Sequence, residues 1–289
     1  MGNKATRIDE QIQLLKNRGM TLEYPEEKVK ELLLDIGYYR LGFYWNPFEV
    51  DKNHTFEKGT TFKDVVKLYY LDFDLRNLLT RYITRIEINF KTKLIYYVSN
   101  KYKNSPTWFI DNEVMNSSFI YSFNKIYNEK FIKNNKPIKK HHDKYINHKY
   151  APAWKTLEFF TFGMVLTVFK SLKDDELKKR IANEFGVMNP KKFINLMETI
   201  VLVRNYCAHG DVLFDLRTPK GITVIPDIEF DKNDRNSLNA CIKVVLFFLN
   251  SVSKNRKNDL ENELKKIFEN LYSNDKLKAI IHNYIKYRS

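Results

Sequence analysis

Apolar residues recur at helical spacing along most of the chain, and the longest such run begins near Thr61. There the segment TTFKDVV resembles a capping box, in which Thr61 caps a helix and Asp64 follows three residues later. The apolar positions that continue this helical period are Phe62, Val65, Val66, Tyr69, Phe73, Leu79, Ile83, Ile86, Phe90 and Leu94. The pattern predicts one long helix, or two abutting ones, over residues 62–98.

Other segments also have the periodicity and end signals of helices. They cover residues 29–36, 154–172, 174–185, 190–209, 238–251, 259–271 and 275–287. The polar, basic stretch NNKPIKKHHDKYINHKY, residues 134–150, predicts a loop instead. Only GITVIPDIEF, residues 221–230, looks extended, because it combines β-branched residues with a proline. The fold class is therefore predicted to be all-α, with at most a small β excursion near residues 221–230.

We expect a single domain over residues 1–289, because this length permits one large helical core. In this scheme residues 1–60 form an N-terminal helical and aromatic segment, and residues 216–289 add C-terminal helices. The core, residues 61–215, carries a basic insert at 91–155. The aromatic run GYYRLGFYWNPF within the N-terminal segment is interpreted as core or interface, with a platform for stacking bases as the less favoured alternative.

The formal net charge of +14 makes a polyanion the leading partner, although an AT-rich genome also produces lysine-rich chains. The excess is concentrated in residues 91–155, which hold thirteen Lys and no Arg against Asp111, Glu113, Glu129 and Asp143. The difference, 13 − 4, is +9, so this segment is the candidate surface for a nucleic-acid backbone. The residues chosen as RNA phosphate contacts are Lys91, Lys93, Lys139 and Lys140.

The cysteines and histidines suggest neither a disulfide framework nor a metal site. Cys207 and Cys241 are the only cysteines, which fits a reducing cytoplasm. The spacing of His141, His142, Asp143 and His148 matches no known metal-ligand pattern. We therefore expect no metal and no cofactor. The most apolar stretch, residues 241–249, is too short to span a bilayer, so no membrane association is expected.

The helix over residues 190–209 holds the candidate chemistry. Asn189 can cap it and Gly210 can end it, which places His209 in the last turn, where the helix dipole favours a cation. Arg204 falls about 20° from the apolar stripe at roughly 100° per residue, so a permanent charge lies on the buried face. Asn205, four residues before His209, can orient the imidazole ring. On an ideal helix Arg204 and His209 lie about 140° apart, so a two-fold pairing of chains would help them converge.

A structural interpretation of the same residues is also open. Arg204 can form a buried ion pair with a carboxylate such as Glu87, while His209 caps the helix end by donating to a carbonyl. A charge on an apolar stripe does not by itself decide between a structural pair and a functional group.

The order of motifs decides the interpretation. RNYCAH, residues 204–209, resembles the HEPN superfamily signature, in which four to six residues separate an Arg from the His that follows it. It is preceded by RGM, IGYYRLGFYWNPF, FEKGTTFKDVVKLYYLDFDLRNLL, ITRIEINFKTKL and PAWKTLEFFTFG. In this order, over roughly residues 5–215, the chain resembles the Abi family of bacterial abortive-infection proteins, of the AbiD and AbiF type.

The resemblance implies a HEPN-like helical bundle that acts in phage defence or growth arrest. It implies a metal-independent endoribonuclease with Arg204, Asn205 and His209 as site residues. RNA is the implied substrate, a small structured RNA a possible controlling partner, and a homodimer or higher homo-oligomer the expected assembly. The family pattern usually continues with a second Arg after the His, whereas here the continuation is GDVLFD.

That departure keeps a second function open, in which the chain is a catalytically silent RNA-binding sensor or regulatory module of an abortive-infection or toxin–antitoxin system. A third hypothesis is an interaction protein that inhibits growth through a protein target.

Overall fold

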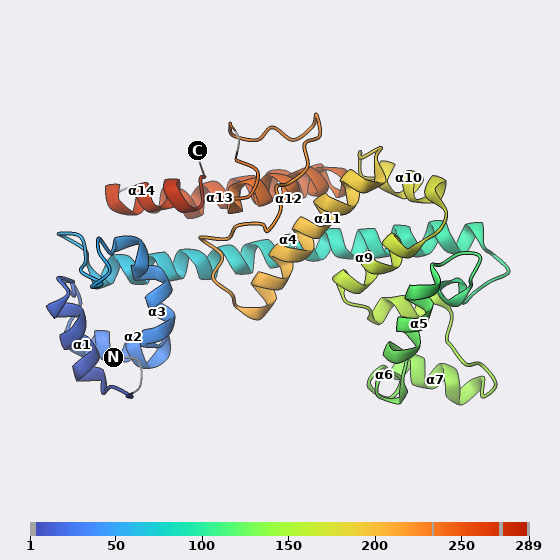
Figure 1. The fold of residues 1–289 in the computed structure, drawn as a ribbon, viewed down its shortest axis with the longest axis horizontal. Coiled ribbons are helices and arrows are strands. Elements are labelled where there is room, and N and C mark those ends of the chain that lie inside the picture. Colours follow the sequence, from blue (N-terminus) through green and yellow to red (C-terminus); the bar gives the residue numbers. More distant parts are fainter. Residues whose placement is uncertain (1–3, 233, 272–273, 288–289) are drawn as a thin grey trace. The chain divides into compact units, whose positions relative to one another are not determined.

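The protein is all-α, as the sequence predicts (Figure 1). The computed structural model describes residues 4–232, 234–271 and 274–287. Within these ranges it contains fourteen α-helices, three short 3-10 helices and no β-strand. None of the described helices has both the length and the apolar composition needed to cross a lipid bilayer.

The helices follow one another with mostly short connections. Their bounds are α1 Ile8–Asn17, α2 Glu26–Asp35, α3 Tyr38–Trp45, α4 Phe62–Lys101, α5 Ser117–Ile126, α6 Glu129–Asn134, α7 Lys136–Lys144, α8 Ala153–Thr156, α9 Phe162–Ser171, α10 Asp175–Asn183, α11 Pro190–His209, α12 Leu238–Val252, α13 Lys254–Glu269 and α14 Asp275–Tyr284. The 3-10 helices are η1 Asn46–Phe48, η2 Trp108–Ile110 and η3 Leu157–Phe159.

The chain divides into two compact units. Unit 1 comprises Met1–Leu78, Tyr206–Leu216 and Asn262–Ser289, and unit 2 comprises Leu79–Asn205 and Arg217–Glu261. Three helices, α4, α11 and α13, contribute residues to both units. Arg204 and Asn205 thus belong to unit 2, whereas His209 belongs to unit 1.

Aromatic residues from distant parts of the sequence form the core of unit 1. The ring of Phe214, just beyond α11, packs 5.5 Å from the Tyr44 ring of α3 and 5.4 Å from the Tyr284 ring of α14. The aromatic run predicted as core or interface divides along the two sides of α3. Tyr44 and Trp45 are buried, whereas the Tyr39 side chain is 82% exposed.

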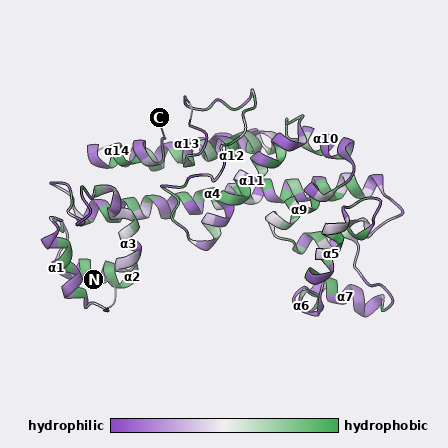
Figure 2. Ribbon diagram, viewed as in Figure 1, coloured by the Kyte–Doolittle hydropathy of each residue, from purple (hydrophilic) through white to green (hydrophobic). Residues whose placement is uncertain are grey.

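Unit 2 is built around a cluster of phenylalanines. Phe90 of α4 lies at the centre, and its ring contacts those of Phe162, Phe169, Phe185 and Phe193 at centroid distances of 5.7 to 6.3 Å. Phe248 of α12 completes the cluster against Phe185 and Phe193. These rings connect α4, α9, α11 and α12 through one fully buried core, which the apolar colouring of α12 also reflects (Figure 2).

The long helix predicted over residues 62–98 is α4. The backbone N–H of Asp64 donates to Thr61 Oγ1 at 3.0 Å, so the predicted cap is present. One detail of the predicted apolar face is wrong: Phe73 is 44% exposed, and the buried position in that turn is Asp72. The buried face follows Leu68, Asp72 and Leu75, and Asp72 is accommodated there because polar groups satisfy its carboxylate.

The loop predicted over residues 134–150 is wrong, since the segment holds the helix α7. Pro137 lies in the first turn, where its missing N–H costs nothing. Ile138 and His141, three residues apart, are buried and hold the helix on unit 2. The helix presents a mostly polar surface, visible as purple ribbon in Figure 2. Two buried residues among so many lysines are too weak a pattern to predict this helix from sequence.

Two other predictions need adjustment. The single helix predicted over residues 154–172 is interrupted, because the Thr161 side chain accepts from the Met164 N–H and starts α9 as a new helix. Residues 221–230 are irregular and form no strand. The Ile222 N–H donates to the Arg235 carbonyl at 2.8 Å, and Ile222, Ile225 and Ile228 point into the core.

Candidate functional site

Helix α11 begins and ends as the sequence predicts. Asn189 Oδ1 accepts from the N–H groups of Lys191 and Lys192 at 2.9 and 3.2 Å. At the other end Gly210 adopts φ +71°, the left-handed conformation that stops a helix. The side chain of His209, in the last turn, is exposed to solvent. An imidazole there is accessible to a large substrate.

Arg204 makes the ion pair that the structural interpretation predicts. Its Nε lies 3.7 Å from Glu87 Oε2, a residue of α4 in the same unit. The pair is not fully buried, because 30% of the Arg204 side chain and 15% of the Glu87 side chain remain exposed. At 3.7 Å the contact orients the guanidinium without engaging it in a close bidentate bridge. The structural and the functional interpretation are therefore compatible.

Asn205 lies beside Arg204. Its Oδ1 accepts from Arg204 Nη1 at 3.4 Å, a long hydrogen bond. This amide and Glu87 together restrain the guanidinium from two sides. The expected contact between Asn205 and the imidazole of His209 stays a prediction.

The segment that follows His209 is held by a buried polar network in unit 1. Asp72 of α4 accepts from the Tyr44 hydroxyl at 2.9 Å, from Arg76 Nη1 at 2.6 Å and from the Leu213 N–H at 2.9 Å. Arg76 Nη1 also donates to the Asp211 carbonyl at 3.0 Å. Because the network reaches Asp211 and Leu213, it determines how the chain leaves α11.

Burying this carboxylate is costly. The side chain of Asp72 is fully buried, and this desolvation raises the pKa of its carboxyl to about 6, although Arg76 and the hydrogen bonds oppose the shift. Burial likewise raises the pKa of the Tyr44 hydroxyl. The ion pair with Arg76 and the hydrogen bonds from backbone N–H groups compensate for the desolvation of the Asp72 carboxylate. A buried carboxylate with these partners fits a role in holding one backbone geometry.

A second arginine contacts the same segment. Arg40 of α3 donates to the carbonyl of Gly210, the residue immediately after His209. Sequence reasoning missed Arg40, Tyr44, Asp72 and Arg76. The available signal was Asp72 and Arg76 at i, i+4 on the buried face of a predicted helix, a pattern typical of a buried ion pair.

The four lysines chosen as phosphate contacts lie in unit 2 and differ in accessibility. Lys91 is 8% exposed, and its Nζ donates to the Glu158 carbonyl at 2.8 Å. Lys93 Nζ lies 3.4 Å from Glu184 Oε2 and 4.4 Å from the centroid of the Phe185 ring. Lys139 and Lys140, on α7, are exposed. The α7 pair is thus better placed than the α4 pair to meet a nucleic-acid backbone.

The histidines near α7 contact one another and a tyrosine. His148 Nδ1 lies 3.3 Å from His141 Nε2, and His142 Nε2 lies 2.8 Å from the Tyr127 hydroxyl. Within the described part of the chain, no group of three or more His, Cys, Asp or Glu side chains is arranged to hold a metal ion. Desolvation lowers the pKa of His141, which favours its neutral form in this packing role.

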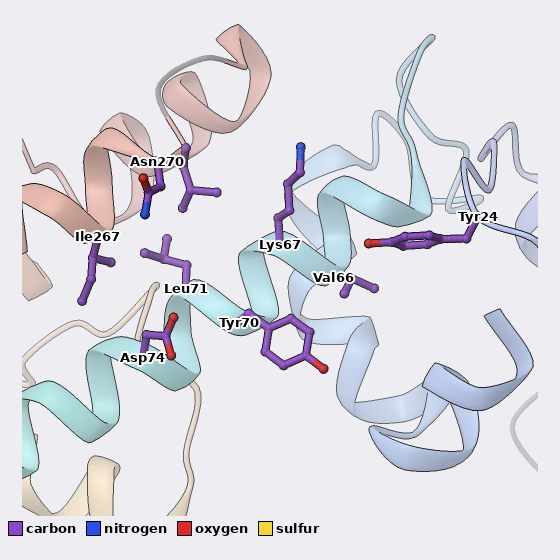
Figure 3. Close-up of a pocket in the computed structure, with 9 residues that line it drawn as sticks. Tyr24, Val66, Lys67, Tyr70, Leu71, Asp74, Ile267 and Asn270 are labelled. Atoms are coloured by element: carbon purple, nitrogen blue, oxygen red, sulfur yellow. The ribbon is translucent and has the colours of Figure 1, made fainter. Parts of the chain in front are cut away.

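Unit 1 also has a surface hollow, and no residue of α11 lines it. Its volume is about 240 Å³, and α4 supplies most of its walls. Figure 3 shows Tyr70, Leu71 and Asp74 from α4 together with Ile267 from α13, Asn270 just after that helix, and Tyr24 at one end. The lining mixes apolar groups with single polar ones and gathers no set of converging charges, so it does not resemble a catalytic site.

Comparison with protein families agrees with the motif order. A family model described as "Abi-like protein" matches residues 31–215, well over half of the chain. The chain belongs to the Abi-like protein family. The match includes α3, α4 and α11, and therefore Arg40, Asp72, Arg204 and His209 of this Abi-like protein. Membership in this family points to abortive infection, a form of phage defence. Neither the curated proteins nor the solved structures yield a match.

Proposed function

We propose that this Abi-like protein is a metal-independent endoribonuclease of the HEPN superfamily, of the AbiD and AbiF type, that arrests growth in phage defence. The observation that carries the proposal is the exposed His209 in the last turn of α11, five residues after a partly exposed Arg204. The reaction is attack of an RNA 2′-hydroxyl on the adjacent phosphate. The O2′–P bond forms, the P–O5′ bond breaks, and the products carry a 2′,3′-cyclic phosphate and a 5′-hydroxyl.

In this mechanism His209 transfers the proton. As general base it accepts the proton of the 2′-hydroxyl, or as general acid it protonates the departing 5′-oxygen, a role worth ~10² to 10⁴-fold in rate. Its exposure allows a polymer to reach it, which a buried imidazole would prevent.

Arg204 stabilises the charge that develops on the phosphorane oxygens. Its planar guanidinium has five N–H donors, and Glu87 and Asn205 engage part of this fork. A guanidinium already oriented by its neighbours loses less conformational entropy when a phosphate binds. Arg204→Lys should therefore lose most of the activity while keeping the charge.

RNA also serves, in this proposal, as a controlling partner. A small structured RNA presents a duplex backbone, and the exposed lysines of α7, including Lys139 and Lys140, offer a surface of opposite charge. DNA can bind the same surface, but it lacks the 2′-hydroxyl and is not a substrate.

The deciding experiment incubates the purified protein and two variants with total bacterial RNA in excess chelator and maps the new ends. We expect cleavage by the wild type, no cleavage by His209→Ala, and wild-type cleavage by His54→Ala, which removes another exposed histidine of unit 1. New ends that bear 5′-phosphates, or activity that chelator abolishes, would refute the mechanism.

One feature favours a second function, a catalytically silent RNA-binding sensor. The residues after His209, GDVLFD, supply no arginine, and Asp211 is exposed in that segment. A carboxylate two residues after the imidazole opposes the negative charge that develops on a phosphate during cleavage, whereas the basic surface elsewhere on the chain still attracts RNA. The sensor predicts salt-dependent binding of RNA that stays intact on long incubation, and binding that survives His209→Ala.

A further inference from the structure

We propose that α3 docks single-stranded RNA at His209, with Arg40 on a phosphate and Tyr39 stacked on a base. This inference names the substrate class for the proposed ribonuclease site and rests on that function. All the residues that carry it belong to unit 1.

The first step concerns Arg40 and the end of α11. Arg40 donates to the carbonyl of Gly210, across 170 residues of sequence, and so brings a guanidinium next to the residue that follows His209. The segment after His209 contains no arginine of its own. The tertiary fold therefore places Arg40 at this segment, as the second cation that the sequence after His209 lacks.

The second step compares Arg40 with Arg76, the other arginine on this segment. Arg76 is buried, and Asp72 neutralises it at 2.6 Å. Arg40 is only partly buried, and the partner found for it in the described residues is a neutral carbonyl. One hydrogen bond to Gly210 engages a small part of a fork with five donors. Arg76 thus has a structural role, whereas Arg40 retains both charge and donors for an anion.

The third step concerns the aromatic residues beside Arg40 on α3. The Tyr39 side chain is 82% exposed, and its ring makes an edge-to-face contact with Phe43, which is 39% exposed, at a centroid distance of 5.4 Å. Phe43 thus supports the ring from one side and leaves Tyr39 accessible. Tyr39 and Arg40 are consecutive residues of a helix, so their side chains diverge by about 100°. A strand that turns around α3 can meet both, with a base on the supported ring and a phosphate on the guanidinium, because every base has a face that can stack.

These steps favour a single strand over a duplex. In a duplex the bases are stacked on each other, and side chains meet mainly phosphates and 2′-hydroxyls. Arg40 alone would serve either form, but Tyr39 can take part only if a base is unstacked. In-line attack by a 2′-hydroxyl also requires a flexible backbone, which a single strand provides.

The test uses a fluorescent single-stranded RNA of about ten nucleotides in which every 2′-hydroxyl is methylated. This probe cannot be cleaved by 2′-hydroxyl attack, so its binding is measured independently of catalysis. The variants are Arg40→Gln, Arg40→Lys and Tyr39→Ala. The controls are Arg7→Gln, which removes an exposed arginine of unit 1, and Tyr121→Ala, which removes a 70% exposed tyrosine of unit 2.

We expect Arg40→Gln and Tyr39→Ala each to lower the affinity for the probe ~10-fold, a typical loss for one phosphate contact or one stacked base. Arg40→Gln should also reduce the slope of log affinity against log salt by roughly 0.7, the value for one phosphate of a single strand. Arg40→Lys should be intermediate, because it keeps the charge and loses the fork. Both controls should bind within about 2-fold of wild type.

A purely structural role for Arg40 predicts a different result. In that case Arg40 contacts no phosphate, so Arg40→Gln would leave affinity and salt slope unchanged, which would overturn the proposal. Equal losses in the controls, a loss of affinity by Tyr39→Ala for a duplex of the same sequence as large as its loss for the single strand, or no binding of the probe by the wild type would also overturn it. Wild-type RNA cleavage together with unaltered probe binding by the variants would overturn the docking on α3 and leave the ribonuclease standing. If the wild type never cleaves RNA but the variants lose affinity for the probe, the ribonuclease function would be overturned and the docking on α3 would be kept.

Discussion

At the scale of single residues, the charged groups around the end of α11 have different tasks. Arg204 and Arg40 are partly exposed, and we propose that they meet a phosphate, whereas Asp72 and Arg76 are buried and hold the backbone after α11. The same residue type thus has a different role according to its accessibility and its partner. Arg76 differs from Arg40 because the carboxylate of Asp72 neutralises its charge.

Replacement of Asp72 by asparagine tests the buried network. Asp72→Asn leaves the Arg76 guanidinium buried without a counter-charge, so we expect the free energy of unfolding to fall by ~3 to 5 kcal/mol. Asp74→Asn, an exposed position two residues along the same helix, should change it by less than about 0.5 kcal/mol. Urea denaturation measures both values. A loss below about 1 kcal/mol for Asp72→Asn would mean that the network contributes little.

At the scale of elements, most helices could be predicted from sequence because their ends carry local signals. Asn189 caps α11, Thr61 caps α4, and Gly210 stops α11. Where prediction failed, the deciding local signal was small or was overlooked. Helix α7 is held by only two buried residues, and the break before α9 follows the cap that Thr161 provides.

Two glycine substitutions should shift stability in opposite directions. Gly210 has φ +71°, and a Cβ at this position would have no atom within 4 Å, so Gly210→Ala should cost about 1 kcal/mol through backbone strain alone. Gly42 lies inside α3, where a Cβ would meet Trp45 at an ordinary 3.7 Å. Gly42→Ala should therefore stabilise the protein by roughly 0.5 to 1 kcal/mol. Thermal unfolding of both variants checks the signs, and a stabilised Gly210→Ala would contradict the left-handed end of α11.

The basic helix α7 makes its own prediction. Replacing Lys139 and Lys140 together by alanine should lower the affinity for structured RNA and reduce the salt slope by roughly 2, about 0.9 per lost phosphate contact. The matched control replaces Lys265 and Lys266, an adjacent exposed pair on α13. Fluorescence anisotropy over a range of salt concentrations distinguishes the two pairs. Equal losses would show that net charge alone attracts the RNA.

At the scale of the whole molecule, the net charge of +14 favours the acidic polymer that we propose as partner. Charge by itself gives attraction without selectivity. The proposed selectivity comes from a small number of positioned groups, namely His209, Arg204, Arg40 and Tyr39.

The proposed assembly is a homodimer, in which two copies of α11 bring two Arg204 and two His209 side chains to one RNA. On one ideal helix the two residues lie about 140° apart, so a second copy would complete the site. Light scattering should therefore give twice the monomer mass at micromolar concentration. In mixed dimers, an excess of His209→Ala should suppress the activity of the wild-type chain. A monomer that remains fully active would exclude this arrangement.

The sequence by itself determined the all-α class, the bounds of α4 and α11, and the family, because helix caps, apolar periodicity and motif order are local properties of the chain. It also identified Glu87 as a partner for Arg204, since a charge on an apolar face requires a nearby counter-charge. Only the tertiary structure decided that Asp72, Arg76 and Arg40 converge on the residues after His209. These contacts join segments more than 100 residues apart, and their formation depends on how whole helices pack, which no local pattern encodes.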